Sequence, residues 1–95
     1  EVKKTGRDKT SLILAVKNEP GDLYKTLESF YVYGVNLTKI ESRPSRKKPW
    51  DYVFFVDLDG HMEDENVKGA VEELMKKNRI IKILGSYPKA SLEEG

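Results

Sequence analysis

The segment Asn18–Leu23, with the sequence NEPGDL, combines residue types that can bind an anion. It follows an apolar run and precedes a helix-like pattern, so it should form the N-terminal end of a helix. The first amides of a helix have no partner within it and favour negative charge, and a glycine lets a ligand approach the backbone closely. A carboxylate would fit there. The same residues also suit an ordinary helix start, in which Pro20 and Gly21 only shape the turn, and spacing alone favours this plainer interpretation.

The single histidine, His61, is a second candidate for chemistry. With Asp59 and Glu63 nearby it could bind a metal ion or transfer protons. A solvated histidine in a turn is the simpler interpretation, and the sequence contains no HExxH, Walker A or dinucleotide-binding glycine pattern. The chain also has no cysteine, which excludes disulfides, thiolate metal sites and thiol nucleophiles. We therefore expect no catalytic residue, no metal site and no cofactor.

A basic cluster between two strand-like runs could bind the phosphates of a nucleic acid. It comprises Arg43, Arg46, Lys47 and Lys48, with Trp50 available to stack on a base. Ferredoxin-like RNA-binding domains use exposed aromatic residues on central strands, but this chain lacks their glycine–aromatic signature. Its 17 basic and 16 acidic residues nearly balance, whereas nucleic-acid-binding domains usually carry a clear basic excess. We expect a solvated hairpin, and a nucleic-acid-binding module is kept as one alternative.

The length and composition indicate one globular domain. A chain of 95 residues can form only a small core, so burial of surface against a partner would add to its stability. Hydrophobic residues make up 38% and charged residues 35% of the chain, which is typical of a domain with a well-charged surface. No apolar run approaches the roughly 20 residues of a membrane-spanning helix, and the polar start has no signal-peptide pattern. We expect a cytoplasmic protein that binds neither membrane nor nucleic acid.

The first half of the chain predicts a strand, a helix and a second strand. Residues 11–16 form an apolar run bounded by polar residues, which indicates a buried strand. The helix should begin at NEPGDL, with Pro20 in its first turn, and end at Gly34. One face of this helix carries Leu23, Leu27 and Phe30. In the second strand, over 35–43, Ile40 is out of phase with the apolar residues before it, which predicts a β-bulge or a late strand start.

The second half predicts a strand, a helix and a last strand. Residues 50–58 form the clearest strand, because apolar side chains on both of its faces indicate a central position in a sheet. One face carries Tyr52, Phe54, Val56 and Leu58, and the other carries Val53 and Phe55. The next helix has acidic residues near its start and basic residues near its end, which complements the helix dipole. Its apolar stripe comprises Val67, Val71, Leu74 and Met75. The last strand is expected over 80–84.

The order strand–helix–strand–strand–helix–strand is typical of a ferredoxin-like α+β sandwich, βαββαβ. Right-handed crossovers place both helices on one face of a four-stranded antiparallel sheet. The other face then stays open, with Val53 and Phe55 directed into it. An open apolar face of this kind favours dimerisation or docking on another domain.

Several ordered motifs make the chain similar to a known family. ESRP at 41–44, PGDL at 20–23, NLTKIESRPS, PWDYVFFVDLDGH and LGSYPKA resemble the C-terminal regulatory ACT domain of prephenate dehydratase, from about Asp8 to the tail. The resemblance implies an ACT regulatory domain over 10–88, a linker from a preceding catalytic domain over 1–9 and a C-terminal tail over 89–95. This fragment would then not be an enzyme, whereas the parent protein would be prephenate dehydratase, a carbon–oxygen lyase.

The resemblance also implies an effector and a binding site. L-Phenylalanine, the end product of the pathway, would bind between the ACT domains of a homodimer or higher oligomer and inhibit the attached catalytic domain. Its carboxylate would meet the backbone amides of Gly21, Asp22 and Leu23, and a second subunit would close the pocket. The implied site comprises Asn18, Pro20, Gly21, Asp22, Leu23, Asn36, Leu37, Thr38, Glu41, Ser42, Arg43 and Pro44.

Asp22 departs from the family pattern, which usually has alanine at this position. A carboxylate there stabilises a helix N-terminus. It could also repel the ligand carboxylate, pair with the ligand ammonium, or pair with Arg43 or Arg46. The stretch NLTKIESRPSR is similar as well to the regulatory domain of aromatic amino acid hydroxylases, which is the nearest alternative. The segments DKTSL and LGSYPKA fit prephenate dehydratase better.

Overall fold

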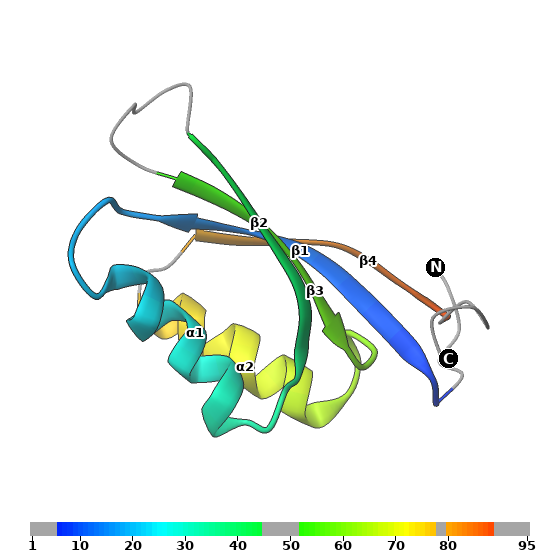
Figure 1. The fold of residues 1–95 in the computed structure, drawn as a ribbon. Helices are drawn as coiled ribbons and strands as arrows, with labels where there is room; N and C mark the ends of the chain where they lie inside the picture. The colour runs from blue at the N-terminus through cyan, green and yellow to red at the C-terminus, as the bar shows by residue number, and fades with distance from the viewer. Residues whose placement is uncertain (1–5, 45–51, 78–79, 89–95) are drawn as a thin grey trace.

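The described part of the chain, residues 6–44, 52–77 and 80–88, forms one sheet and two helices in this computed structural model. The elements are, in order, β1 (Asp8–Val16), α1 (Asp22–Val32), β2 (Leu37–Pro44), β3 (Tyr52–Asp59), α2 (Glu65–Lys76) and β4 (Ile80–Pro88). The strands form an antiparallel sheet in the order β2-β3-β1-β4, and both helices cover the same face of it (Figure 1). The predicted ferredoxin-like α+β fold is confirmed.

The hydrophobic core lies between the sheet and the helices. Every second residue of β1 is buried, because the side chains of a strand alternate between its faces. The buried apolar residues are Leu12, Leu14, Val16, Phe30, Val35, Val56, Leu58, Val67, Ala70, Val71 and Leu74. The predicted inward face of β3 is confirmed, since Phe54 packs against the same core. The predicted apolar stripe of α2 is wrong at Met75, which is 58% exposed. Ala70 is buried instead, because it lies nearer to the middle of the buried helix face.

The C-terminal end of α1 is closed by two backbone hydrogen bonds. The Gly34 amide donates to the Tyr31 carbonyl at 3.0 Å, and the Val35 amide donates to the Phe30 carbonyl at 2.8 Å. These bonds define a Schellman motif, which requires a left-handed residue after the helix. Gly34 supplies it with a φ of 70°. The buried side chains of Phe30 and Val35 add the hydrophobic contact that often accompanies this motif, and Gly34 is confirmed as the helix stop.

The irregular pattern of β2 has the predicted cause. The strand begins at Leu37, and its register against β3 shifts between Leu37 and Lys39. Thr38 is therefore the extra residue of a β-bulge, and it reverses the phase of the residues that follow. The bulge explains why Ile40 is out of phase with Leu37, whereas the late start only leaves Val35 outside the strand.

The strands β1 and β4 are longer than predicted. They pair from Asp8 opposite Pro88 onward, so Asp8 and Lys9 belong to the sheet and not to the linker expected over 1–9. The inward positions of this extension are polar, although Asp8 and Thr10 are buried, and an apolar pattern therefore could not reveal it. A second bulge lies in β4, where the register shift leaves Leu84 as the extra residue.

Gly69 of α2 faces the ring of Tyr33, the residue that follows the last turn of α1. A Cβ atom added at Gly69 would lie 2.5 Å from that ring. Alanine normally stabilises a helix by about 1 kcal/mol relative to glycine. Here we expect Gly69→Ala to lower the free energy of unfolding by about 1 kcal/mol instead, because the ring must be displaced from its packed position.

Urea denaturation measures this difference directly. In a Tyr33→Ala background the same Gly69→Ala change should become stabilising, because the obstructing ring is gone. Lys68→Ala, an exposed neighbour, is the control and should change stability by less than about 0.5 kcal/mol. Stabilisation by Gly69→Ala with Tyr33 in place would contradict the contact.

Candidate functional site

The connection between β1 and α1 contains a left-handed glycine. Gly21 precedes the helix with a φ of 80°, and its carbonyl accepts the Lys25 amide at 3.0 Å. Glycine adopts this conformation at little cost, unlike other residues. A Cβ atom added at Gly21 would have nothing within 4 Å, so the backbone is open to an approaching group. Asn18 and Pro20 are exposed beside it, and Pro20 lies before the helix and not in its first turn as expected.

The carboxylate of Asp22 is turned back toward β1. Its Oδ2 accepts the Lys17 backbone amide at 2.8 Å, and the residue is only 8% exposed. A negative charge in the first turn is also favoured by the helix dipole. The Asp22 amide itself donates to the Glu19 carbonyl at 3.1 Å. The expectation of three available amides from Gly21 to Leu23 is therefore corrected, because the middle amide already has a partner.

The residues at the start of β2, 36–38, lie at the other end of α1. Asn36 donates from Nδ2 to the Asp59 carboxylate at 3.0 Å, and Leu37 packs against the core. The helix between the two groups has 11 residues, which corresponds to about 16 Å. One copy of the chain thus keeps residues 36–38 apart from Gly21.

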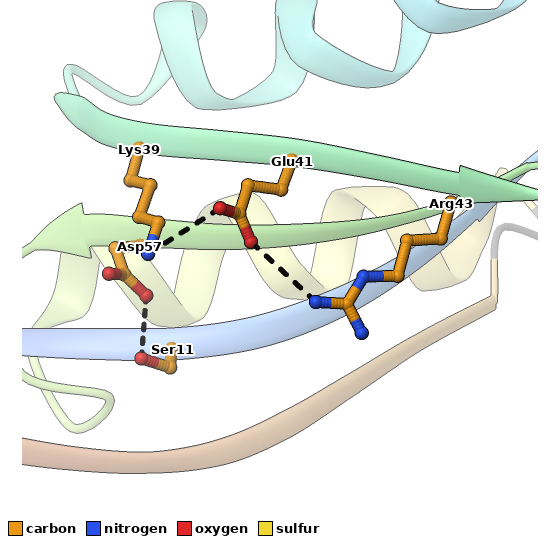
Figure 2. Close-up of polar contacts among 5 residues, drawn as sticks. All are labelled: Ser11, Lys39, Glu41, Arg43 and Asp57. Carbon is orange, nitrogen blue, oxygen red and sulfur yellow. Dashed lines mark hydrogen bonds and ion pairs between the residues drawn. The ribbon is translucent and has the colours of Figure 1, made fainter.

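The ESRP stretch at the end of β2 is divided between the two faces of the sheet. Glu41 and Arg43 lie on the open face together with Lys39, away from α2 (Figure 2). Ser42 alternates with them and lies on the face that the helices cover. For Pro44 the structure describes the backbone, which pairs with β3. Within one copy Glu41 and Arg43 are therefore not brought to the start of α1, although the resemblance implied a single site for all of them.

The three open-face charges of β2 alternate in sign. Glu41 lies 3.8 Å from the Lys39 ammonium and 4.0 Å from the Arg43 guanidinium. The same guanidinium lies over the Phe55 ring, 4.9 Å from its centroid. All three charged side chains are more than half exposed, so each ion pair contributes only about 0–1 kcal/mol to stability. The ion pairs therefore add little to the stability of one copy. Because the three charged side chains are exposed, a partner could contact them.

His61 is buried, so the expectation of a solvated turn histidine is wrong. It is 2% exposed, its Nδ1 accepts the Glu63 amide at 3.1 Å, and its own amide donates to the Asp64 carboxylate at 2.9 Å. These bonds satisfy amides around the start of α2, where a helix lacks internal acceptors. Among the described residues no three metal-ligating side chains gather into a group that could hold an ion.

The outward face of α1 carries a surface that the sequence analysis missed. Tyr24 is 70% exposed and Tyr31 is 84% exposed, and with Leu27 and Glu28 they line a groove of about 240 Å³. Their spacing of three, four and seven residues was the available signal, because such residues share one helix face. Figure 2 shows α1 beyond the β2 edge of the sheet.

Most of the basic cluster considered for nucleic-acid binding, Arg46, Lys47, Lys48 and Trp50, lies outside the described residues. In the ranges that are described, neither helix has the length and apolar character needed to cross a membrane.

Comparison with known proteins establishes the class. The model of the ACT domain family matches residues 10–74, and the chain belongs to this family. Within it, the resemblance to the regulatory domain of prephenate dehydratase is confirmed. A bifunctional chorismate mutase/prephenate dehydratase of Aquifex aeolicus is 64% identical over 94 residues, which are 99% of this chain and 26% of that protein. The chain thus spans about a quarter of the length of the curated relatives it matches.

Solved structures of similar proteins share this fold. A prephenate dehydratase from Arthrobacter aurescens in complex with L-Phe superimposes with a TM-score of 0.84 at 37% identity, over 94% of this chain and 29% of that one. A protein described as the quorum-quenching acylase GqqA gives a TM-score of 0.86 at 31% identity, over 97% of this chain and 47% of that one.

The contact of Asp22 with β1 predicts a role in stability. We expect Asp22→Ala to lower the free energy of unfolding by about 1–3 kcal/mol, because it leaves the Lys17 amide without this charged acceptor and removes a favourable charge from the helix start. Asp22→Asn should have a smaller effect, since it keeps an acceptor oxygen. Urea denaturation is the measurement, with the exposed Glu19→Ala as control. Equal stability of Asp22→Ala and the unaltered chain would contradict the contact.

Proposed function

We propose that this chain is the effector-sensing part of a prephenate dehydratase and that it binds L-phenylalanine between two copies. The observation that carries the proposal is the separation of the two halves of the implied site, at opposite ends of α1. The relatives support the ligand class, because the similar Arthrobacter dehydratase was solved in complex with L-Phe. The same relatives favour a dehydratase over the hydroxylase alternative.

Antiparallel pairing of two copies along β2 would join the two halves. Val16 at the end of β1 and Pro44 at the end of β2 both pair with Tyr52, so the start of α1 and the end of β2 lie at one end of the sheet. A twofold axis across the β2 edge brings the start of the second copy's β2 to that end. Asn36 and Thr38 of one copy would then face Gly21 of the other.

The ligand carboxylate would meet the amides of Gly21 and Leu23 at the positive end of α1. The Asp22 carboxylate does not oppose it there, because it is turned toward Lys17. A second copy paired along β2 would come close to α1, whose outward face carries the exposed groove of Tyr24 and Tyr31.

Binding across this interface provides a route to regulation. A ligand that contacts both copies stabilises the arrangement in which both halves of the site meet, and it shifts the equilibrium toward that arrangement. In the parent protein the shift would hold the attached catalytic domains in an inactive state, so that L-phenylalanine inhibits the conversion of prephenate to phenylpyruvate.

Isothermal titration with L-phenylalanine tests the ligand, with L-tyrosine and L-tryptophan as comparators. We expect saturable and selective binding of L-phenylalanine, and a higher proportion of paired copies when it is present, because the ligand binds only the paired form. A folded, paired sample that does not bind L-phenylalanine would overturn the proposal.

Replacement of Gly21 tests the location of the site. We expect Gly21→Ala to weaken L-phenylalanine binding at least about tenfold, because its Cβ enters the space beside the amides that would hold the carboxylate. The matched control is Gly34→Ala at the other end of α1, where φ is 70° and a Cβ would likewise have nothing within 4 Å. Both variants should lose similar stability through left-handed strain. Equal loss of binding in the two variants would argue against an amide site at Gly21.

A further inference from the structure

The open face of the sheet contains a hollow of about 270 Å³ that the proposed effector site does not use. All four strands border it, and the side chains that give it its chemistry are those of Ser11, Lys39, Glu41, Phe55, Asp57 and Leu84. Leu12 and Val56 also border it, and they contribute backbone because their side chains are buried in the core. The hollow therefore combines charged groups, a hydroxyl and apolar surface over the two central strands.

Small residues and a β-bulge create this hollow. Ser11 lies between Asp57 of β3 and Gly85 of β4 in the cross-strand pairing. A Cβ atom added at Gly85 would have nothing within 4 Å, so no side chain fills the space on that side. The bulge of β4 places Leu84 beside this gap, where it is 51% exposed. The sheet face is thus indented where its neighbouring positions carry larger side chains.

The carboxylate of Asp57 is held in a fixed position inside the hollow. The Ser11 hydroxyl donates to Asp57 Oδ1 at 2.6 Å (Figure 2). Both residues belong to the central strands of the sheet, so their backbones are held on two sides. Within the ranges that the structure describes, no hydrogen bond is donated to the second oxygen, Oδ2. An acceptor on a rigid element with one unused oxygen is suited to bind a donor from a ligand.

The charges around the hollow favour a cation. Two carboxylates, of Glu41 and Asp57, line it together with one ammonium, of Lys39. Glu41 lies 3.8 Å from the Lys39 ammonium and 4.0 Å from the Arg43 guanidinium. Both distances exceed the roughly 2.7–2.9 Å of a charge-assisted hydrogen bond. Asp57 is therefore the anion without a matching cation, and the half-exposed Lys39 can move away when another cation enters.

Apolar surface completes the hollow. The ring of Phe55 is half-buried, and the exposed Leu84 lies on the neighbouring part of the lining. The volume is somewhat below the roughly 300–1,000 Å³ of pockets for drug-sized ligands, so a ligand with only a few carbon atoms would fit.

We propose that this hollow is a second ligand site, which binds a small primary amine. The ammonium group donates to Asp57 Oδ2 and to the Glu41 carboxylate, and the short apolar body lies against Phe55 and Leu84. Lys39 competes with the ligand, because its own ammonium is attracted to the same carboxylates. The site is distinct from the effector site at Gly21 and does not depend on it.

Titration with isoamylamine, followed by NMR of the backbone amides, tests the ligand class. We expect saturable shifts of the Leu12 and Val56 amides and none of the Gly21 and Leu23 amides, which L-phenylalanine should move instead. The two proposals can therefore fail separately. Isoamyl alcohol and isocaproate keep the branched carbon chain but lack the ammonium, so they should bind at least about tenfold more weakly. L-Leucine adds a carboxylate beside Asp57, and equal or tighter binding of L-leucine would overturn the amine class.

Three variants test the assigned roles in the same titration. Asp57→Asn keeps an acceptor for the Ser11 hydroxyl but removes the charge, and it should weaken isoamylamine binding at least about tenfold. Lys39→Gln removes the competing cation and should strengthen binding about two- to fivefold. Lys82→Gln is the matched control, since it removes an exposed cation from the same face outside the hollow and should leave the affinity unchanged. The proposal is overturned if Asp57→Asn binds as well as the unaltered chain, or if Lys39→Gln binds more weakly.

Discussion

The packing of the central strands against the two helices determines on which face of the sheet all the remaining side chains lie. Leu12 and Leu14 of β1 and Val56 and Leu58 of β3 are almost fully buried in this layer. Because strand side chains alternate with a period of two, a slip of one residue would move all of them to the opposite face. The positions of Glu41 and Arg43 on the open face follow from the same constraint, since β2 pairs in register with β3 beyond its bulge.

The dimensions of α1 impose a second constraint, which concerns function. The helix begins at an open glycine backbone and ends in a Schellman motif, so its two ends are well defined. Groups at the two ends cannot contact one small ligand within a single copy. Groups from both ends of the helix can contact the same ligand only if one of the ends belongs to a second copy. Ligand recognition is then coupled to the arrangement of the copies.

The sequence was sufficient for the fold, which depends on apolar periodicity and on glycine, and it offered the β-bulge of β2 as one of two explanations for the irregular pattern there. It failed where a polar side chain is buried by local hydrogen bonds. His61 and Asp8 are buried, and no periodicity marks such residues. The sequence left three possible partners for the carboxylate of Asp22. Its hydrogen bond with the Lys17 amide depends on how the chain turns before the helix, which the sequence pattern does not show. The motif ESRP was treated as one unit, yet strand alternation divides it between two faces.

The bulges at Thr38 and Leu84 lie in the two edge strands of the sheet. An uninterrupted edge strand is a template for adding further strands without limit, which is how ordered fibrils grow. A bulge leaves one residue out of the ladder and bends the strand, so that a flat incoming strand cannot pair along its whole length. The pairing proposed along β2 would cover one of these edges with a second copy, whereas the bulge of β4 limits the addition of further strands at the other edge.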